Sequence, residues 1–252
     1  MTDEAGSNTS TLTGAAKAVG MGQPIEWLKQ GWAYFMKNPG IWIGLSVALL
    51  AITIILSFVP FIGQLCLNLA MPALMAGLLI GCRSLQQGKE LTFEHLFAGF
   101  KQNANGLLMV GVWYTIGAVA IMMIGGFLMF LVGGSALAAV LFTGNHEATA
   151  GLGIFAILMM LAVALFMLAL FLPLFMAMWF APPLVTFGNM EPLAAMKASF
   201  AGSLKNILPF LVYGVILLVL GFVATIPAFL GWLILMPVLY GAHYAAYQDI
   251  FE

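Results

Sequence analysis

Six apolar runs, each long enough to cross a membrane as a helix, restrict what this chain can fold into. A helix that spans the bilayer needs about 20 apolar residues at a rise of 1.5 Å each. The chain is 63% hydrophobic and 7% charged, whereas about a quarter of the residues of a soluble domain are charged. We therefore predict an all-α integral membrane protein with six transmembrane helices, formed by a single membrane domain over residues 23–252. The runs occupy residues 41–59, 62–83, 106–132, 151–181, 207–225 and 229–247.

The positions of the basic residues predict how these helices are oriented. If the N-terminus is cytoplasmic and there are six spans, all 8 Lys and Arg residues lie on one side of the membrane. The loops on the other side then contain no Lys or Arg. Their ionisable residues are His146 and Glu147, in a wider predicted loop over residues 133–150. Cytoplasmic loops are enriched in Lys and Arg, so we predict that both termini are cytoplasmic. Residues 1–22 are rich in small polar residues and are predicted to be a disordered cytoplasmic tail.

Three similar segments, GWAYFMKN, LFAGFKQN and SFAGSLKN, each precede an outgoing apolar run and end at Asn38, Asn103 and Asn206. Apolar residues recur at helical spacing in and before these segments, with lysines beside them. Each is therefore predicted to be an amphipathic helix in the cytoplasmic membrane surface, and each Asn a hinge at which the chain turns into the bilayer. The lysines are candidate contacts for lipid headgroups or a partner: Lys29, Lys37, Lys101, Lys197 and Lys205.

Each returning run contains one interior proline, at Pro72, Pro173 or Pro237. Proline removes one helix hydrogen bond and bends a helix, so these residues are candidate structural hinges. The pattern predicts three repeat units, at about 24–84, 92–184 and 192–247, each with a surface helix and a helical hairpin. Small residues four apart in the second and last runs predict close helix contacts within the chain, with a homodimer contact as the alternative.

The stretch FAPPLVTFGNMEPLAAMKASF, residues 180–200, is the most distinctive segment of the chain. Its paired prolines end the fourth run at the cytoplasmic surface, and Trp179 just before them is expected to anchor at the membrane interface. Two interpretations are open for this segment, a rigid exit from the membrane or a docking surface for a partner or a lipid headgroup.

Candidate chemistry is sparse in the predicted membrane segments. No ionisable residue lies near the centre of a predicted span, where such residues usually serve transport or catalysis. His243 is close to the cytoplasmic end of the last run, and the 17 methionines are interpreted as apolar packing rather than metal ligands. We expect no enzyme activity, cofactor or metal site, and the net charge of −1 does not favour nucleic acid as a partner.

Three segments, GWAYFMKNPGIW, FAPPLVTFGNMEPLAAMKASF and the terminal YAAYQDIF, resemble a family of uncharacterised small bacterial inner-membrane proteins. The resemblance covers most of residues 24–252. The ending is similar, more distantly, to membrane domains attached to glycerophosphodiester phosphodiesterases, which implies envelope or lipid-related work without an active-site residue.

We therefore expect a non-enzymatic multi-pass membrane protein that binds lipid or a protein partner, or that organises the envelope. The partners considered are membrane lipids, another membrane protein and a second copy of the chain. The alternative is a transporter or channel for a neutral or amphiphilic solute, with a cavity among the bent returning helices. Open space beside the three prolines would favour transport, and solid packing there would count against it.

Overall fold

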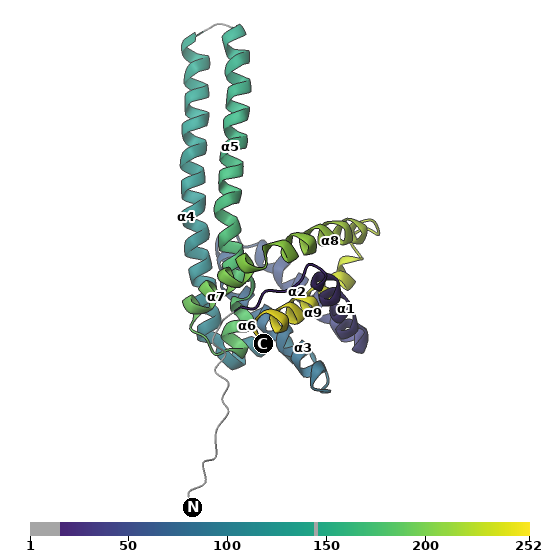
Figure 1. Ribbon diagram of the computed structural model, residues 1–252. Coiled ribbons are helices and arrows are strands. Elements are labelled where there is room, and N and C mark those ends of the chain that lie inside the picture. Colours follow the sequence, from purple (N-terminus) through teal and green to yellow (C-terminus); the bar gives the residue numbers. More distant parts are fainter. Residues whose placement is uncertain (1–15, 144–145) are drawn as a thin grey trace, which may run out of the picture.

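The computed structural model describes residues 16–143 and 146–252, with side chains described over 16–134 and 153–252. Every regular element in these ranges is a helix, which confirms the predicted all-α fold (Figure 1). The elements are α1 (Gln23–Lys37), α2 (Pro39–Ser57), α3 (Ile62–Gln86), η1 (Phe93–Phe97), α4 (Ala98–Thr143), α5 (His146–Trp179), α6 (Ala181–Phe187), α7 (Pro192–Lys205), α8 (Ile207–Thr225) and α9 (Trp232–Phe251).

Five segments of the described chain are long and apolar enough to cross a membrane: α2, α3, α8, residues 93–134 and residues 153–187. The predicted sixth span, residues 229–247, lies in α9, which is not one of the five. Most of the α9 side chains are buried against other helices rather than exposed to the surroundings. Six spans therefore remain a prediction.

The α4–α5 pair extends away from the other helices, and α8 runs off in a different direction (Figure 1). The three helical pairs are thus not aligned in one bundle. Helix α4 continues to Thr143 and α5 begins at His146, so the predicted wide loop over 133–150 is wrong, because apolar residues extend both helices beyond the predicted spans. Residues 144–145 lie outside the described residues.

Each surface helix packs chiefly on the returning helix of another unit. The surface helices are α1, η1 with the first turn of α4, and α7, and the returning helices are α3, α5 and α9. Helix α1 packs on α9, where a Cβ at Gly31 would fall on the Val238 carbonyl. The start of α4 packs on α3 in the same way, since a Cβ at Gly99 would fall on the Ala73 carbonyl. Glycine permits this approach because it has no side chain to separate the two backbones.

The third contact completes the pattern, because α7 packs on α5, where the Ser199 hydroxyl donates to the Met176 carbonyl at 2.6 Å. The surface helices of units one, two and three are thus seated on the returning helices of units three, one and two. The packing relates the units cyclically, and the first and last helices of the chain are neighbours.

The hinge asparagines share a conformation in the first two units. Asn38 (φ −156°, ψ 73°) caps α2, with its side-chain oxygen accepting from the Ile41 N–H at 3.3 Å. Asn103 (φ −149°, ψ 58°) interrupts α4 and accepts from the Gly106 N–H at 3.1 Å. Both side chains bind the amide three residues ahead, which is the usual role of an N-cap. Asn206 (φ −112°, ψ 31°) has no such bond.

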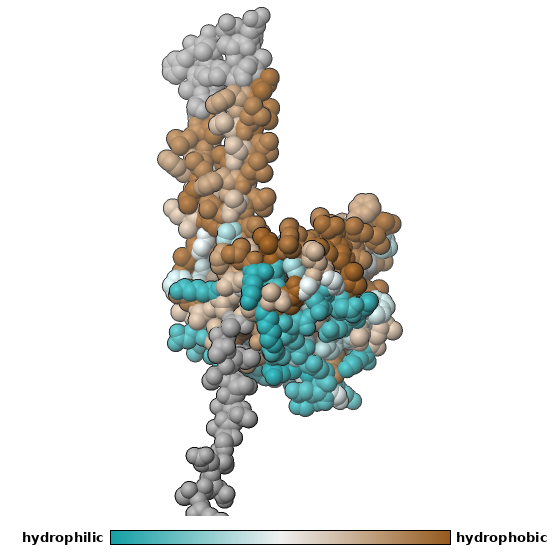
Figure 2. All heavy atoms as spheres, in the orientation of Figure 1, coloured by the Kyte–Doolittle hydropathy of each residue, from teal (hydrophilic) through white to brown (hydrophobic). Residues whose placement is uncertain are grey.

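The molecular surface separates into an apolar and a polar part (Figure 2). Apolar residues cover the α4–α5 pair and α8, whereas hydrophilic residues gather at the opposite end of the body. Large apolar side chains such as Phe130 and Leu218 are 74% and 75% exposed, as expected of surfaces that face lipid.

Helix α1 has two apolar stripes. Trp27, Gly31 and Tyr34 face α9 and are buried, whereas Trp32 and Met36 are 50% and 54% exposed. The surface helix is therefore held by protein on one side and leaves its predicted lipid-facing stripe free.

The prediction that residues 1–22 form a disordered tail is wrong for residues 16–19. Lys17 donates its amide to the Ile250 carbonyl at 2.7 Å, and Val19 donates its amide to the Asn206 side chain at 2.8 Å. These bonds hold residues 16–19 on the body of the protein, and residues 1–15 lie outside the described residues.

Candidate functional site

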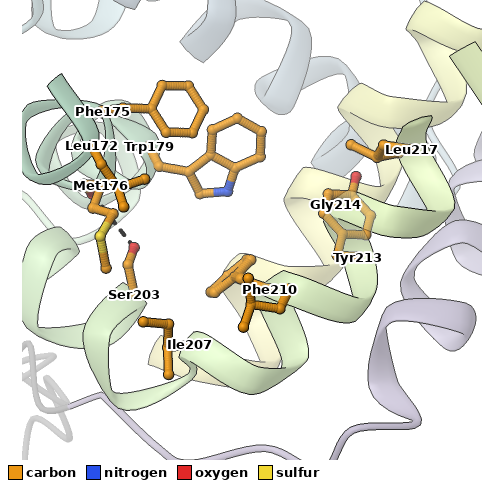
Figure 3. Close-up of a pocket in the computed structure, with 11 residues that line it drawn as sticks. Leu172, Phe175, Met176, Trp179, Ser203, Ile207, Phe210, Tyr213, Gly214 and Leu217 are labelled. Carbon is orange, nitrogen blue, oxygen red and sulfur yellow. Dashed lines mark hydrogen bonds between the residues drawn. The ribbon is translucent and has the colours of Figure 1, made fainter. Parts of the chain in front are cut away.

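An apolar crevice opens in the angle between α5 and α8, and we call it the α5–α8 crevice (Figure 3). Its volume is about 360 Å³, which is within the range of small-molecule sites. Helix α5 forms one wall, α8 forms the other, and Ser203 of α7 lies between them. The lining residues are Leu172, Phe175, Met176, Trp179, Ser203, Ile207, Phe210, Leu211, Tyr213, Gly214 and Leu217.

The α5 wall is fixed by a hydroxyl inserted into its last turn. Helix α5 ends at Trp179, and α6 follows with Pro182 and Pro183 in its first turn, neither of which has an N–H to continue the ladder. At this break the Phe180 N–H donates to the Ser199 hydroxyl at 2.8 Å, and the same hydroxyl donates to the Met176 carbonyl at 2.6 Å. Ser199 therefore takes the place of a direct helix bond and ties α7 to α5.

Trp179 places the one indole N–H of the crevice at this end of α5. Its Nε1 is buried and has no hydrogen-bond partner among the described residues. Two rings contact the indole, the parallel His243 ring at 4.8 Å and the tilted Phe175 ring at 5.0 Å between ring centroids. Figure 3 shows its nitrogen directed toward the space between α5 and α8. Because a buried donor without an acceptor costs about 1–3 kcal/mol, the crevice favours an occupant that carries an acceptor.

A buried aromatic cluster supports the α8 wall. Trp27 lies 5.6 Å from Phe210 and 5.9 Å from Tyr213, measured between ring centroids. The Trp27 indole is completely buried and donates its N–H to the Asp249 carboxylate at 2.7 Å. This hydrogen bond joins α1 to the end of α9, so both ends of the chain hold the helix that bounds the crevice.

The walls and the donor together select a chemical class of occupant. Apolar side chains line nearly the whole crevice, and the Trp179 N–H is a neutral donor at one end. A hydrocarbon chain fits the walls, and a neutral carbonyl or ester oxygen fits the indole.

The predicted headgroup lysines do not form one site in the structure. Lys29 pairs with Glu26 at 2.8 Å, and Lys101 pairs with Glu94 at 3.4 Å. All four side chains are more than half exposed, so these ion pairs contribute little to stability. They do, however, reduce the net positive charge that these two lysines present to a membrane.

The other three predicted lysines are used in different ways. Lys37 donates to the Leu85 carbonyl and Lys205 donates to the Ala16 carbonyl, at 2.8 and 2.7 Å. Lys197 makes no hydrogen bond or ion pair with the described part of the chain. Lys37 and Lys205 therefore join segments of the protein. Of these three lysines, only Lys197 has an ammonium group that makes no polar contact with the described residues.

The predicted proline hinges also lie in different surroundings. Pro72 and Pro237 are inside α3 and α9 and are buried, whereas Pro173 is inside α5 and exposed. The residues that follow the buried prolines, Ala73 and Val238, are at most 7% exposed. The space beside Pro72 is thus packed, whereas Val238, next to Pro237, lines an apolar groove of about 580 Å³ between α1, α8 and α9. No residue of α3 or α5 lines this groove, so the three prolines do not share one cavity.

Sequence reasoning missed the residues that shape the crevice. Trp179 is predicted to anchor at the interface, but the ring that stacks on it, His243 of α9, comes from a distant part of the chain. Ser199 carries no local signal of its role, because the Phe180 N–H that it binds lies 19 positions earlier in the chain. The paired prolines themselves mark this position in the sequence.

Comparison with known proteins supports a membrane location for this architecture. The chain is 28% identical over 199 residues to a probable inner membrane protein of Burkholderia thailandensis, an alignment that covers 75% of this chain and 70% of the relative. No protein-family model matches the chain, and no solved structure matches it. With five helices in its described residues that could cross a membrane, the chain is a multi-pass membrane protein.

Proposed function

We propose that this protein is a lipid-binding protein of the bacterial inner membrane and that the α5–α8 crevice holds one acyl chain of a glycerolipid. In this proposal the Trp179 N–H donates to the ester carbonyl of that chain. The observation that carries the proposal is the buried indole donor at the end of an apolar crevice, which has no partner in the described part of the chain. The proposal assigns no catalytic step to the protein.

The position of the crevice along α5 supports this assignment. Exposed apolar residues, including Leu168 and Leu172, precede Trp179 on α5, and the charged residues of α7, Lys197 and Lys205, follow it. Trp179 is therefore at the level where apolar surface gives way to polar surface. Tryptophan favours this boundary, and glycerolipid esters occupy the same depth.

We further propose that the polar end of the body faces the cytoplasm. The basic residues outside the apolar surfaces support this orientation, because cytoplasmic loops are enriched in Lys and Arg. In this proposal both termini are cytoplasmic, and α9 forms a sixth membrane segment, inside the protein rather than at the lipid surface.

Lipid binding is supported better than transport of a neutral or amphiphilic solute. Transport would need a path through the body, whereas the region around Pro72 is packed. The groove beside Pro237 is lined by α1, α8 and α9 and has no lining residue from α3 or α5. The crevice, by contrast, opens sideways on an apolar face between two helices.

The experiment uses the full chain in nanodiscs that contain phosphatidylethanolamine with a photoreactive diazirine on one acyl chain. After illumination, crosslinks are mapped by mass spectrometry, and yields at α5 and α8 are compared with the yield at Phe127, which is 62% exposed on α4. We expect crevice residues to be labelled more strongly than Phe127. Equal labelling of the crevice and Phe127 would contradict the proposal.

A filled crevice provides the matched test. Gly214 lines the crevice, and a Cβ there would meet nothing within 4 Å, so Gly214→Leu has room for its Cβ and adds bulk to the crevice wall. Gly133 on α4 is equally open, and Gly133→Leu is the control. We expect Gly214→Leu to reduce crevice crosslinking severalfold and the control to leave it unchanged.

The indole donor is tested with Trp179→Phe, which keeps an aromatic ring and removes the N–H. The parent chain is expected to bind ester-linked lipid about 2- to 10-fold better than ether-linked lipid, as one hydrogen bond contributes about 0.5–1.5 kcal/mol. The variant should lose this preference. An equal preference in parent and variant would show that the indole does not bind the ester.

A further inference from the structure

Residues 16–19 cross the junction between α7 and α8 as an extended segment. Asn206 binds this segment through both ends of its amide, accepting from the Val19 N–H at 2.8 Å and donating to the Lys17 carbonyl at 2.9 Å. The Lys17 N–H donates to the Ile250 carbonyl of α9 at 2.7 Å. Every one of these bonds goes to the backbone of the segment, so the site recognises an extended peptide rather than particular side chains.

The sequence explains why Asn206 is available for this contact. The matching residues Asn38 and Asn103 use their side-chain oxygens to bind the amide three residues ahead. Three residues after Asn206 is Pro209, which has no N–H to offer. Asn206 is nevertheless only 1% exposed, and its amide finds its partners in residues 16–19 and in the Gly202 carbonyl at 2.9 Å.

The same junction positions one wall of the α5–α8 crevice. Helix α7 is tied to α5 through Ser199, so α7 and the α5 wall are held together. Helix α8 leaves α7 at Asn206, and the next residues, Ile207 and Phe210, line the crevice. The direction of α8 at Asn206 therefore sets how far its wall lies from α5.

We propose that Asn206 and the Ile250 carbonyl form a binding site for an extended peptide, which residues 16–19 occupy as a latch that fixes the α7–α8 junction and thereby the width of the α5–α8 crevice. The lipid role of the crevice rests on the proposed function, whereas the latch itself does not. Release of the latch frees the Asn206 amide and lets α8 move relative to α5.

The latch is tested in the full chain with a substitution outside the crevice. Val19→Pro removes the N–H that donates to the Asn206 side-chain oxygen. Ala18→Pro is the matched control, because the Ala18 N–H has no hydrogen-bond partner in the described part of the chain. Hydrogen exchange of the Lys17 amide reports release of the latch. Spin labels at Leu168 and Leu218, exposed on α5 and α8, report the separation of the two walls after the exposed Cys66 is replaced by serine.

We expect Val19→Pro to speed exchange of the Lys17 amide about tenfold, as for loss of one well-formed hydrogen bond, and to broaden the distribution of distances between the labels. Ala18→Pro should change neither measurement. Unchanged exchange in Val19→Pro, or faster exchange with an unchanged distance distribution, would overturn the proposal. Both measurements are independent of lipid, so absence of crevice crosslinking in the parent chain would refute the lipid assignment alone.

Discussion

Ser199→Ala should destabilise the protein far more than its size suggests. The hydroxyl that it removes is inserted between the Phe180 N–H and the Met176 carbonyl, and Ser199 is completely buried. Phe180 is also completely buried, so no water can replace the acceptor that its N–H loses. The substitution thus removes a donor and an acceptor at once from the end of α5.

The two losses differ in size. The unpaired Phe180 N–H costs about 1–3 kcal/mol, whereas loss of the Met176 bond costs about 0.5–1.5 kcal/mol, because the Ser203 hydroxyl still lies 3.4 Å from that carbonyl. We therefore expect Ser199→Ala to lower the free energy of unfolding by about 2–4 kcal/mol. An average hydrogen bond between membrane helices contributes only about 0.6 kcal/mol, so the insertion should stand out from an ordinary contact.

Reversible unfolding in mixed micelles, titrated with a denaturing detergent, measures this difference. Ser203→Ala is the matched control, since it removes only the long bond to Met176 and should cost less than about 1 kcal/mol. If Ser199→Ala and Ser203→Ala lowered the stability equally, the inserted hydroxyl would not be the element that holds α7 to α5.

Three further predictions follow from the packing, the hinges and the orientation. Gly31→Val should prevent α1 from seating on α9 and lower the melting temperature sharply in a thermal scan, whereas Gly40→Val, where a Cβ meets nothing within 4 Å, should cost about 1 kcal/mol or less. Asn103→Ala should lower the free energy of unfolding in the same detergent titration by about 1 kcal/mol through loss of a helix cap, and a gain in stability would exclude that role. A cysteine at position 197 should react with an impermeant maleimide only after the cells are opened; labelling of intact cells would reverse the proposed orientation.

Hydropathy predicted the helical segments of this fold because every helix that spans the bilayer needs a run of about 20 apolar residues. The positions of α2, α3 and α8 follow from runs of apolar residues that a sequence displays directly. Hydropathy also located α9, as the run over residues 229–247, but it could not show that Tyr244 and Tyr247 face protein rather than lipid. Its surroundings depend on which helices cover it, and that is a property of the tertiary packing.

The asparagine motif shows where local sequence suffices and where it does not. Asn38 and Asn103 bind amides three residues ahead, and that spacing can be read from the chain. Pro209 shows that Asn206 must behave differently, but only the fold reveals that its partner is the segment before the first helix. The crevice is missed for a similar reason, because Trp179 and Gly214 lie on helices whose meeting depends on contacts distant in sequence.

The seating of α1 on α9 has a consequence for biogenesis. During synthesis, α1 leaves the ribosome before any residue of α9 exists, so its principal docking surface is missing until translation is almost complete. The Trp27 indole and its Asp249 acceptor are 222 positions apart, and no earlier helix offers that carboxylate. The first unit must therefore wait, with its aromatic face uncovered, for the last helix to enter the membrane. A chain truncated before α9 should for this reason be recognised by quality-control proteases as incomplete.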